Sequence, residues 1–245
     1  MISVVDVGAA NIDSAPPYVP LLKRGLCEVL CFEPQVDFWP SQSEHVTCRP
    51  DVVGDGREHT LYLSNAPGMT SLYRINAPIW DVLCPKRDGE KLVRVVHEKR
   101  VPTIRLNDID VERIDFLKMD AQGAELMVIK GGHIKIMRAL CVHTEVSFVP
   151  LYVGQPMFAD IDQALGDLGF LFHSFCEFHI QKIGDGAGPS RQVTQADAVY
   201  FRDFTNLDGL SVRDRETMAT IAELCYGSYD LAQLCRRSID GHHSD

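Results

Sequence analysis

The stretch IDFLKMDAQGAELMVIKGG, residues 114–132, and the stretch RALCVHTEVSF, residues 138–148, together decide the fold of this chain. Residues 114–120 form an apolar run that is typical of a buried strand. Residues 121–132 give a turn and then a helical pattern, which the pair Gly131-Gly132 is expected to end. Residues 138–148 are a second apolar run of strand length. Nearly apolar strands on both sides of a helix predict a parallel sheet that helices cover on both faces.

The same alternation continues on both sides of this unit. Residues 45–56 predict a third strand, which the turn Gly54-Asp55-Gly56 joins to an antiparallel strand at 57–65, and residues 66–88 are expected to form a loop. The late strands have no long helix between them, which predicts an antiparallel hairpin at one edge of the sheet. We expect one domain, with residues 1–205 as its α/β part and residues 206–245 as a helical extension and polar tail of the same domain. The other expected strands are 3–8, 27–34, two pieces within 91–106, 170–175, 177–184 and 196–203. Residues 14–25 are expected to be a connection that leads into a short helix, 158–169 a helix, and 213–237 one helix or a pair of helices.

The charge balance argues against a nucleic-acid partner. The 245 residues include 24 Lys and Arg against 34 Asp and Glu, a formal net charge of −10, and the sequence shows no basic face. No apolar run approaches the roughly 18 residues of a membrane span, and the strand after Met1 leaves no room for a signal peptide. The eight cysteines are scattered without a paired C-x-x-C, which favours free thiols in a reducing compartment. We expect a cytoplasmic protein without a nucleic-acid or membrane partner, and a homo-oligomer is compatible with this composition.

The first expected strand ends in small residues, in the sequence SVVDVGAAN (residues 3–11). Small residues at a strand tip let a cofactor approach the backbone, but the G-x-G-x-x-G spacing of a dinucleotide site is missing. Glu33 lies at the tip of the second strand, 25 positions after Gly8, where a carboxylate can accept both hydrogen bonds of a ribose diol. A ribose without a pyrophosphate favours S-adenosylmethionine. The alternative is that Glu33 is a surface carboxylate before a proline.

Four segments of the chain resemble one family. DVGAAN (6–11), CFEP (31–34), the stretch 114–132 and HTEVSFVPLYVGQPMFADIDQALGDLGF (143–170) are similar in order and spacing to the FkbM family of S-adenosylmethionine-dependent methyltransferases. The resemblance implies a Rossmann-like class I methyltransferase fold with a mostly parallel seven-stranded sheet. It also implies O-methylation of a hydroxyl, on a sugar or a small natural product.

The resemblance also implies where the cofactor binds. Residues 8–11 would hold its methionine part, a segment with Ser71 would lie near the cofactor or the acceptor, and Tyr152 and Gln155 would belong to a loop over the acceptor pocket. Asp51 or Asp55, at the end of the third strand, would meet the adenine amino group, although the glycines around Asp55 also favour a turn. The residues expected at the cofactor are Asp6, Gly8, Ala9, Ala10, Asn11, Glu33, Pro34, Asp55, Ser71, Asp120 and Gln122.

Asp120, Glu145 and His143 are the candidate catalytic residues. A hydroxyl nucleophile must lose its proton, which a carboxylate or an imidazole can accept. Asp120 ends a buried strand and is also a suitable helix N-cap, whereas Glu145 and His143 share one face of the next strand. Two carboxylates there would act as a base or bind a divalent metal ion. Glu125, in the first turn of the helix, is explained equally well by the helix dipole.

Two other functions are compatible with parts of the pattern. A nicotinamide-dependent oxidoreductase would share the sheet, but the dinucleotide glycines and a Tyr/Lys catalytic pair are missing. A non-catalytic binding or assembly module fits the first loop, where the family usually has D-V-G-A-N-x-G. This chain has an extra Ala10 before Asn11 and Asp13 where a glycine is expected. The retained carboxylates Glu33 and Asp120 favour a methyltransferase with a small hydroxylated acceptor, a sugar or glycosylated metabolite.

Overall fold

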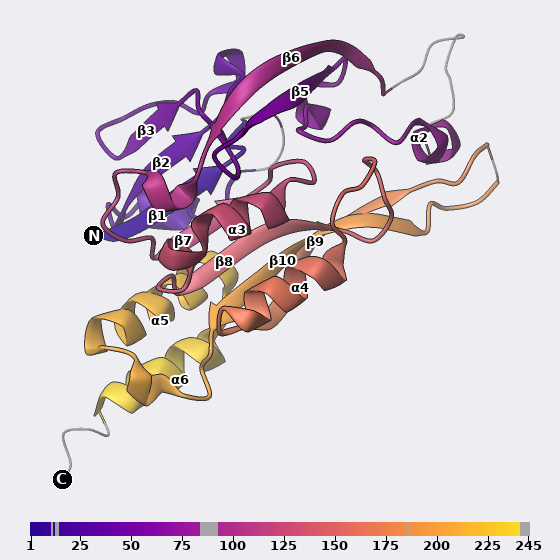
Figure 1. Cartoon of the computed structure of the whole chain (residues 1–245). Coiled ribbons are helices and arrows are strands. Elements are labelled where there is room, and N and C mark those ends of the chain that lie inside the picture. Colours follow the sequence, from indigo (N-terminus) through magenta and orange to yellow (C-terminus); the bar gives the residue numbers. More distant parts are fainter. Residues whose placement is uncertain (11, 13–14, 84–92, 186, 241–245) are drawn as a thin grey trace.

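The computed structural model describes residues 1–10, 12, 15–83, 93–185 and 187–240. Within them, seven strands form one sheet in the order β3-β2-β1-β7-β8-β10-β9 (Figure 1). The strands from β3 to β8 are parallel, and β10 runs antiparallel to both of its neighbours. This confirms the mostly parallel sheet with an antiparallel edge hairpin. The strands are β1 (Ile2–Val7), β2 (Cys27–Phe32), β3 (Val46–Arg49), β7 (Phe116–Met119), β8 (Cys141–Ser147), β9 (Phe170–Gln181) and β10 (Gln192–Arg202).

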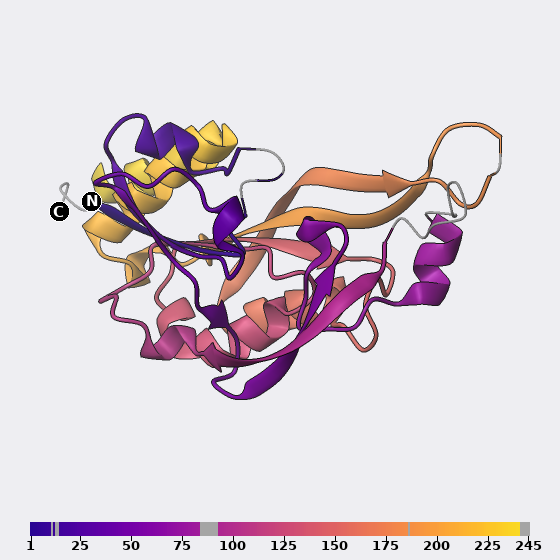
Figure 2. The ribbon, with the colours of Figure 1, turned by 90° about the horizontal axis from the view of Figure 1, so that it is seen from above.

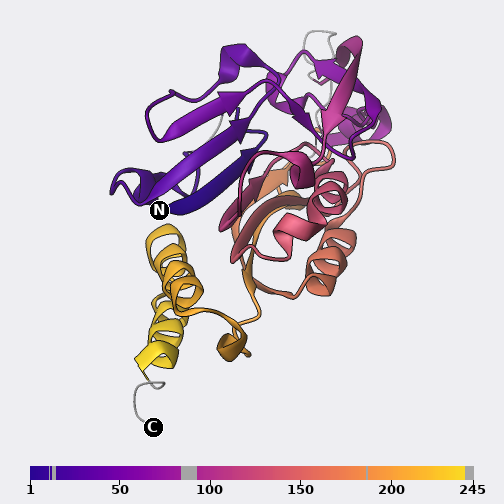
Figure 3. The same ribbon diagram turned by 60° about the vertical axis from the view of Figure 1, so that its left-hand side comes forward.

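Helices cover both faces of this sheet, with α3 and α4 on one face and α5 and α6 on the other (Figures 1 and 3). The alternation of side chains in β1 produces this arrangement. Val4 packs in a core that includes Met218 of α5, and Val5 packs in the opposite core with Val128 of α3. The helices are α1 (Val19–Leu22), α2 (Ala77–Leu83), α3 (Glu125–Ile136), α4 (Phe158–Asp167), α5 (Val212–Tyr226) and α6 (Tyr229–Asp240), and the short 3₁₀ turns are η1 (Val36–Phe38), η2 (Pro67–Met69), η3 (Leu106–Asp108) and η4 (Leu207–Gly209). None of the helices in the described part of the chain has the length and hydropathy that a bilayer span requires.

A second, small sheet contains β4 (Val52–Val53), β6 (Val95–Ile104) and β5 (Glu58–Ser64), in that order. The expected pairing of the 57–65 strand with the third strand is therefore wrong, because β5 pairs antiparallel with β6. The two strand pieces expected within 91–106 are also wrong, since β6 is one continuous strand that includes Pro102. Its neighbour β4 pairs with it only at Thr103 and Ile104, so Pro102 lies where β6 is an edge strand on that side and no N–H is needed.

Two other boundaries differ from the sequence prediction. β9 is one strand from Phe170 to Gln181 rather than two, and with β10 it forms a long hairpin that reaches α2 (Figure 2). Irregular register with β10 lets β9 continue through the expected break. The segment 66–88, expected to be loop, contains η2 and α2 in its described part.

Helix α3 does not end at Gly131-Gly132 but continues to Ile136. The glycines are there for close packing. A Cβ on Gly131 would lie 2.1 Å from the backbone oxygen of Gly54, and one on Gly132 would lie 2.8 Å from Cβ of Leu106. Both approaches are closer than real side chains allow, so the pair lets α3 pack against the backbone that follows β4 and against η3.

Gly131→Ala is therefore expected to destabilise the protein by about 1–3 kcal/mol, since the backbone of Gly54 must move. Gly166→Ala in α4 is the matched control, because a Cβ there meets open space, and it is expected to be neutral or to stabilise by up to about 1 kcal/mol. Urea denaturation of both variants measures the difference. Equal stability of the two would show that the contact between α3 and Gly54 is loose.

Candidate functional site

The strand order reverses between β1 and β7, and the carboxyl ends of β1, β2, β7 and β8 meet at one edge of the sheet. Gly8 follows β1, Glu33 follows β2 and Asp120 follows β7. The Asp120 N–H donates to the oxygen of Val7 at 2.8 Å. Gly8 has φ +78°, and a Cβ on it would lie 1.8 Å from the backbone oxygen of Asp120. Only glycine permits this contact, which holds the two strand ends together.

A first cavity opens at these strand ends. It encloses about 720 Å³ of space, part of which is open to solvent, a size that suits a small-molecule ligand. Val53 and Leu61, from the second sheet, contribute apolar walls. The predicted cofactor residues that line this cavity are Gly8, Ala10, Glu33, Pro34, Ser71, Asp120 and Gln122.

Glu33 is a buried acidic residue in the lining of this first cavity. The residue is 3% exposed, and its Oε1 accepts the backbone N–H of Gln35 at 2.7 Å. Burial raises the pKa of the carboxyl, while the hydrogen bonds of Gln35 act in the opposite direction and the charge of Asp120 raises it further. Glu33 is therefore not a surface carboxylate. A buried carboxylate beside a cavity is stabilised by any ligand that donates hydrogen bonds to it.

A second cavity lies next to the first and shares Ala10, Asp120 and Gln122 with it. Its lining is more polar and includes the two other candidate catalytic residues, Glu145 and His143. Two cavities that meet at one carboxylate are suited to two ligands that react with each other. Other polar residues of the second cavity are Lys118, Glu177, His179, Asp197 and Tyr226.

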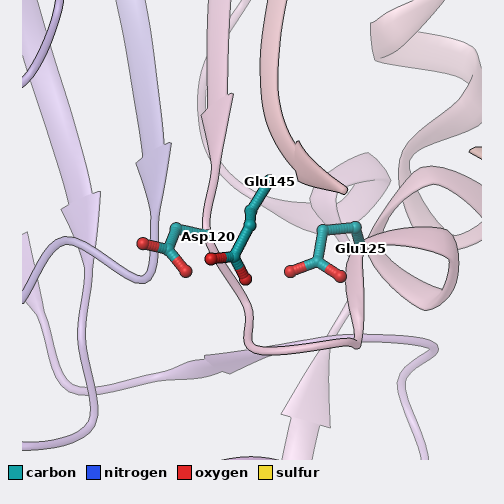
Figure 4. Close-up of side chains that lie close together, drawn as sticks. All are labelled: Asp120, Glu125 and Glu145. Carbon is teal, nitrogen blue, oxygen red and sulfur yellow. The ribbon is translucent and has the colours of Figure 1, made fainter. Parts of the chain in front are cut away.

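Three carboxylates lie together next to the second cavity, with Glu145 of β8 between Asp120 and Glu125, the first residue of α3 (Figure 4). One oxygen of each lies within 4.8 Å of the others. Burial is the main cause that raises the pKa of all three: that of Glu125 rises to about 7, and that of Glu145 well above its usual range. For Asp120, the Lys118 ammonium and a hydrogen bond from Gln122 oppose the rise in pKa. Asp120 is therefore the better proton acceptor, and Glu145 favours its protonated form.

The same three carboxylates are the ligand type that a hard divalent cation prefers. Glu125, however, already uses its Oε1 to accept the N–H groups of Ala121 at 2.8 Å and Gly123 at 3.2 Å, at the start of its own helix. It lines neither cavity. Protonation of one or more of these carboxyl groups would relieve the electrostatic repulsion between them without a metal ion.

His143 is held by two neighbours at the wall of the second cavity. Its Nε2 lies 3.2 Å from Oδ2 of Asp197, and its Nδ1 lies 3.1 Å from the hydroxyl of Tyr226, on which the imidazole ring also stacks. Burial alone would raise the pKa of Asp197, but the hydrogen bond and charge of His143 lower it. The imidazole is therefore oriented, and both of its nitrogens already have partners.

Sequence reasoning missed the charged group at the centre of the site. Lys118 lies on β7, and its Nζ is 3.1 Å from Oδ1 of Asp6 on β1, whose Oδ2 accepts the hydroxyl of Tyr18 at 2.6 Å. Burial would lower the pKa of Lys118, but the charges of Asp6 and Asp120 raise it, so the ammonium is retained. A lysine within an otherwise apolar strand was the available signal. Asp197 and Tyr226, which hold His143, gave no comparable signal.

Several predicted residues lie outside the cavities. Asp6 is 1% exposed and pairs with Lys118, and Ala9 is buried in the core beneath the loop. Asp55 accepts the N–H of Arg57 at 3.0 Å and forms a hydrogen bond with His59, which agrees with the turn that its flanking glycines favour. Of the two aspartates considered for the adenine amino group, Asp51 is the one that lines the first cavity. Asn11 lies outside the described residues.

Tyr152 and Gln155 do not form a loop over the acceptor pocket. Both are buried and line neither cavity. Gln155 accepts the N–H of Tyr152 at 2.6 Å and donates to Ser147 Oγ at 2.8 Å, which anchors this segment to the end of β8. The two residues therefore have a structural role beside the site.

Sequence comparison identifies the family of this chain. The family model described as "Methyltransferase FkbM domain" matches residues 6–172, more than half of the chain. The chain belongs to the FkbM methyltransferase family. It is therefore a methyltransferase that uses S-adenosylmethionine and acts on an acceptor, as the resemblance implied. In chain order, the FkbM match extends from the end of β1 to the start of β9, and it includes the carboxyl ends of β1, β2, β7 and β8.

No curated protein matches the sequence of this FkbM protein. Solved structures give distant likenesses. A magnesium protoporphyrin IX methyltransferase from Synechocystis PCC 6803 with bound SAM is 13% identical, with 82% of this chain and 69% of that chain covered and a TM-score of 0.35. A precorrin-6y C5,15-methyltransferase from Geobacter metallireducens is 9% identical, with 82% and 81% covered and a TM-score of 0.38. A SAM-dependent methyltransferase from Anabaena variabilis is 6% identical, with 82% and 77% covered and a TM-score of 0.38.

The first cavity of the FkbM domain has the groups that S-adenosylmethionine needs. The buried Glu33 carboxylate faces it, a glycine lies at the tip of β1, and the apolar walls suit an adenine ring. The dinucleotide alternative is not supported by the family match.

Proposed function

We propose that this methyltransferase transfers the methyl group of S-adenosylmethionine to a hydroxyl of a small acceptor, a sugar or a glycosylated metabolite. The observation that carries the proposal is the position of Asp120, which lines both cavities. A group there faces the methyl donor on one side and the acceptor on the other. The first cavity would hold the cofactor and the second the acceptor.

The residues of the first cavity would divide the cofactor between them. Glu33 would accept hydrogen bonds from the ribose diol, Asp51 would meet the adenine amino group, and the backbone at Gly8 and Ala10 would lie along the methionine part. When bound, S-adenosylmethionine supplies a methyl group that its sulfonium charge already activates. The protein then needs to align the two ligands and exclude water.

Asp120 would accept the proton of the acceptor hydroxyl. Burial raises the pKa of its carboxyl, and the nearby Lys118 ammonium and the Gln122 amide, which donates to Oδ1 at 2.6 Å, oppose this rise and favour the ionised form. Burial and the charge of Asp120 raise the pKa of Glu145. Glu145 would therefore hold a proton and donate it in a hydrogen bond to another oxygen of the acceptor. His143 would contact the acceptor while Asp197 fixes its ring.

The second cavity supports a neutral, hydroxyl-rich acceptor. Carboxylates on several strands surround it, and its ammonium group, Lys118, is already paired with Asp6. Phosphorylated acceptors would meet these carboxylates and the net charge of −10. A sugar offers many hydroxyl donors to carboxylate acceptors and has no charge to repel.

The test is methyl transfer to a panel of neutral glycosides and their phosphorylated counterparts, with products identified by mass spectrometry. Binding of S-adenosylhomocysteine is measured first by calorimetry, with NAD as the control. Methyl ethers formed on neutral glycosides would support the proposal. N- or C-methylated products, or activity confined to phosphorylated acceptors, would refute it, and failure to bind S-adenosylhomocysteine would favour the non-catalytic module.

Glu33→Gln is expected to weaken the binding of S-adenosylhomocysteine by about 10–100-fold, because it removes a charged acceptor of the ribose diol. Its volume is unchanged, so the stability of the fold should be retained. Asp55→Asn is the matched control, because Asp55 lies outside the first cavity, and it is expected to bind as the wild type does. Calorimetric titration measures both, and unchanged affinity in Glu33→Gln would exclude the ribose contact.

A further inference from the structure

Gln122 adopts an unusual backbone conformation at the point where the two cavities meet. Its φ is +50°, the one positive φ of a non-glycine residue in the described part of the chain. L-residues with a long side chain rarely adopt this region, so the surroundings must hold it. Ser71 does so from the turn after β5, since its Oγ donates to the backbone oxygen of Gln122 at 2.6 Å.

The side-chain amide of Gln122 connects a buried tyrosine to the candidate base. Its Nε2 donates to Oδ1 of Asp120 at 2.6 Å and lies 3.5 Å from Oε2 of Glu145, while its Oε1 accepts the hydroxyl of Tyr152 at 2.7 Å. The amide has one face that donates and one that accepts. The ionised Asp120 accepts only, so it requires the NH₂ group, and the carbonyl oxygen is left for Tyr152.

Tyr152 is suited to fix this amide. Its side chain is fully buried, and burial, followed by the charges of Glu145 and Asp120, raises its pKa well above the usual range, so its hydroxyl remains a donor. Gly123 allows the ring to come close, because a Cβ there would lie 3.2 Å from Cδ2 of the tyrosine. Gln155 holds the backbone of Tyr152 in place.

We infer that Tyr152 is a positioning residue for methyl transfer, which holds the Gln122 amide in the orientation that directs its N–H to Asp120. Tyr152 lines neither cavity, so it acts through Gln122 and not by touching a ligand. Without the hydroxyl, the amide is free to rotate and the Asp120 carboxylate loses a donor. This inference rests on the proposed function, because Asp120 is taken as the proton acceptor.

The first test measures the pKa of Asp120 directly and needs no activity. Carboxyl ¹³C NMR titration of the full chain, assigned with Asp120→Asn, is expected to show a pKa about one unit higher in Tyr152→Phe than in the wild type. Tyr200→Phe is the matched control, since this buried tyrosine donates to Asp162 at 3.2 Å, outside both cavities, and should leave the pKa unchanged. An unchanged Asp120 pKa in Tyr152→Phe would overturn the inference.

The change in pKa must come from the hydrogen bond alone. The other titratable groups that face Asp120 are Lys118, Asp6, Asp197, Glu33, Glu125 and Glu145, and none of them is altered in Tyr152→Phe. Tyr152 faces Asp120 too, but its raised pKa keeps the hydroxyl neutral, so the variant removes no charge. Gln122→Leu removes the amide and leaves the tyrosine. It is expected to give at least the same increase, and it serves as the test where Tyr152→Phe does not fold.

The second test uses the methyl-transfer rate. Tyr152→Phe is expected to lower kcat about 10-fold, to leave KM within about twofold and to move the acidic limb of the pH profile upward. Adding Tyr152→Phe to Gln122→Leu should cause no further loss, whereas additive losses would overturn the route through Gln122. A wild-type protein that binds the cofactor but transfers no methyl group refutes the proposed function. The NMR titration would still decide whether Tyr152 acts on Asp120.

Discussion

Asp120→Asn is expected to lower kcat by about 10²–10⁴-fold, the contribution that a well-placed general base makes. Asparagine keeps the shape of the side chain but has no carboxylate to accept the hydroxyl proton. Binding of S-adenosylhomocysteine should change much less, since Glu33 and the backbone at Gly8 remain in the first cavity. Steady-state kinetics and calorimetry on the same preparation separate the two effects.

The competing bases are tested in parallel with Asp120→Asn. Glu145→Gln and His143→Asn are expected to lower kcat less, because Glu145 favours its protonated form and both nitrogens of His143 already have partners. A larger loss in either variant than in Asp120→Asn would move the proton acceptor to that residue. Asp167→Asn, on the exposed end of α4, is the matched aspartate control and should retain full activity.

The βαβ unit and the strand tips could be predicted from the sequence because their signals are local. Residues 114–120 and 138–148 are apolar runs of strand length, and Glu33 and Asp120 directly follow such runs. Parallel strands bring their carboxyl ends to one edge, so the residues after them can be placed without coordinates. The sequence therefore predicts which residues lie at the strand ends beside the first cavity.

The parts that could not be predicted depend on partners far apart in the sequence. The pair Gly131-Gly132 has the composition of a helix end, yet its role is the contact with Gly54, 77 positions earlier in the chain. The pairing of β5 with β6 also crosses a long segment that contains α2. Local propensity carries no information on either contact. The polar groups of the second cavity have the same origin, since His143 meets Asp197 only after β10 pairs with β8.

Lys118→Met is expected to destabilise the fold by about 3–5 kcal/mol, the cost of leaving a buried charge without its partner. The side chain of Lys118 on β7 is 15% exposed, and its Nζ is 3.1 Å from Oδ1 of Asp6, which is 1% exposed. Methionine fills a similar volume, so lost packing contributes little. The remaining hydrogen bond to Asp6, from the hydroxyl of Tyr18, does not neutralise the charge. Urea denaturation with a two-state analysis measures the loss.

The double variant Asp6→Asn, Lys118→Met separates this electrostatic cause from a loss of shape. Removing both charges together is expected to recover more than half of the stability lost in Lys118→Met, because no unpaired ion remains in the core. If the double variant is as unstable as Lys118→Met alone, the side chain of Lys118 matters for packing rather than for charge. Asp120 supplies a second readout, since the Lys118 ammonium opposes the rise that burial causes in the pKa of its carboxyl. Even where the fold is restored, the double variant should therefore show a higher Asp120 pKa and a pH profile moved upward, because the lost Lys118 ammonium lowers that pKa more than the lost charge of Asp6 raises it.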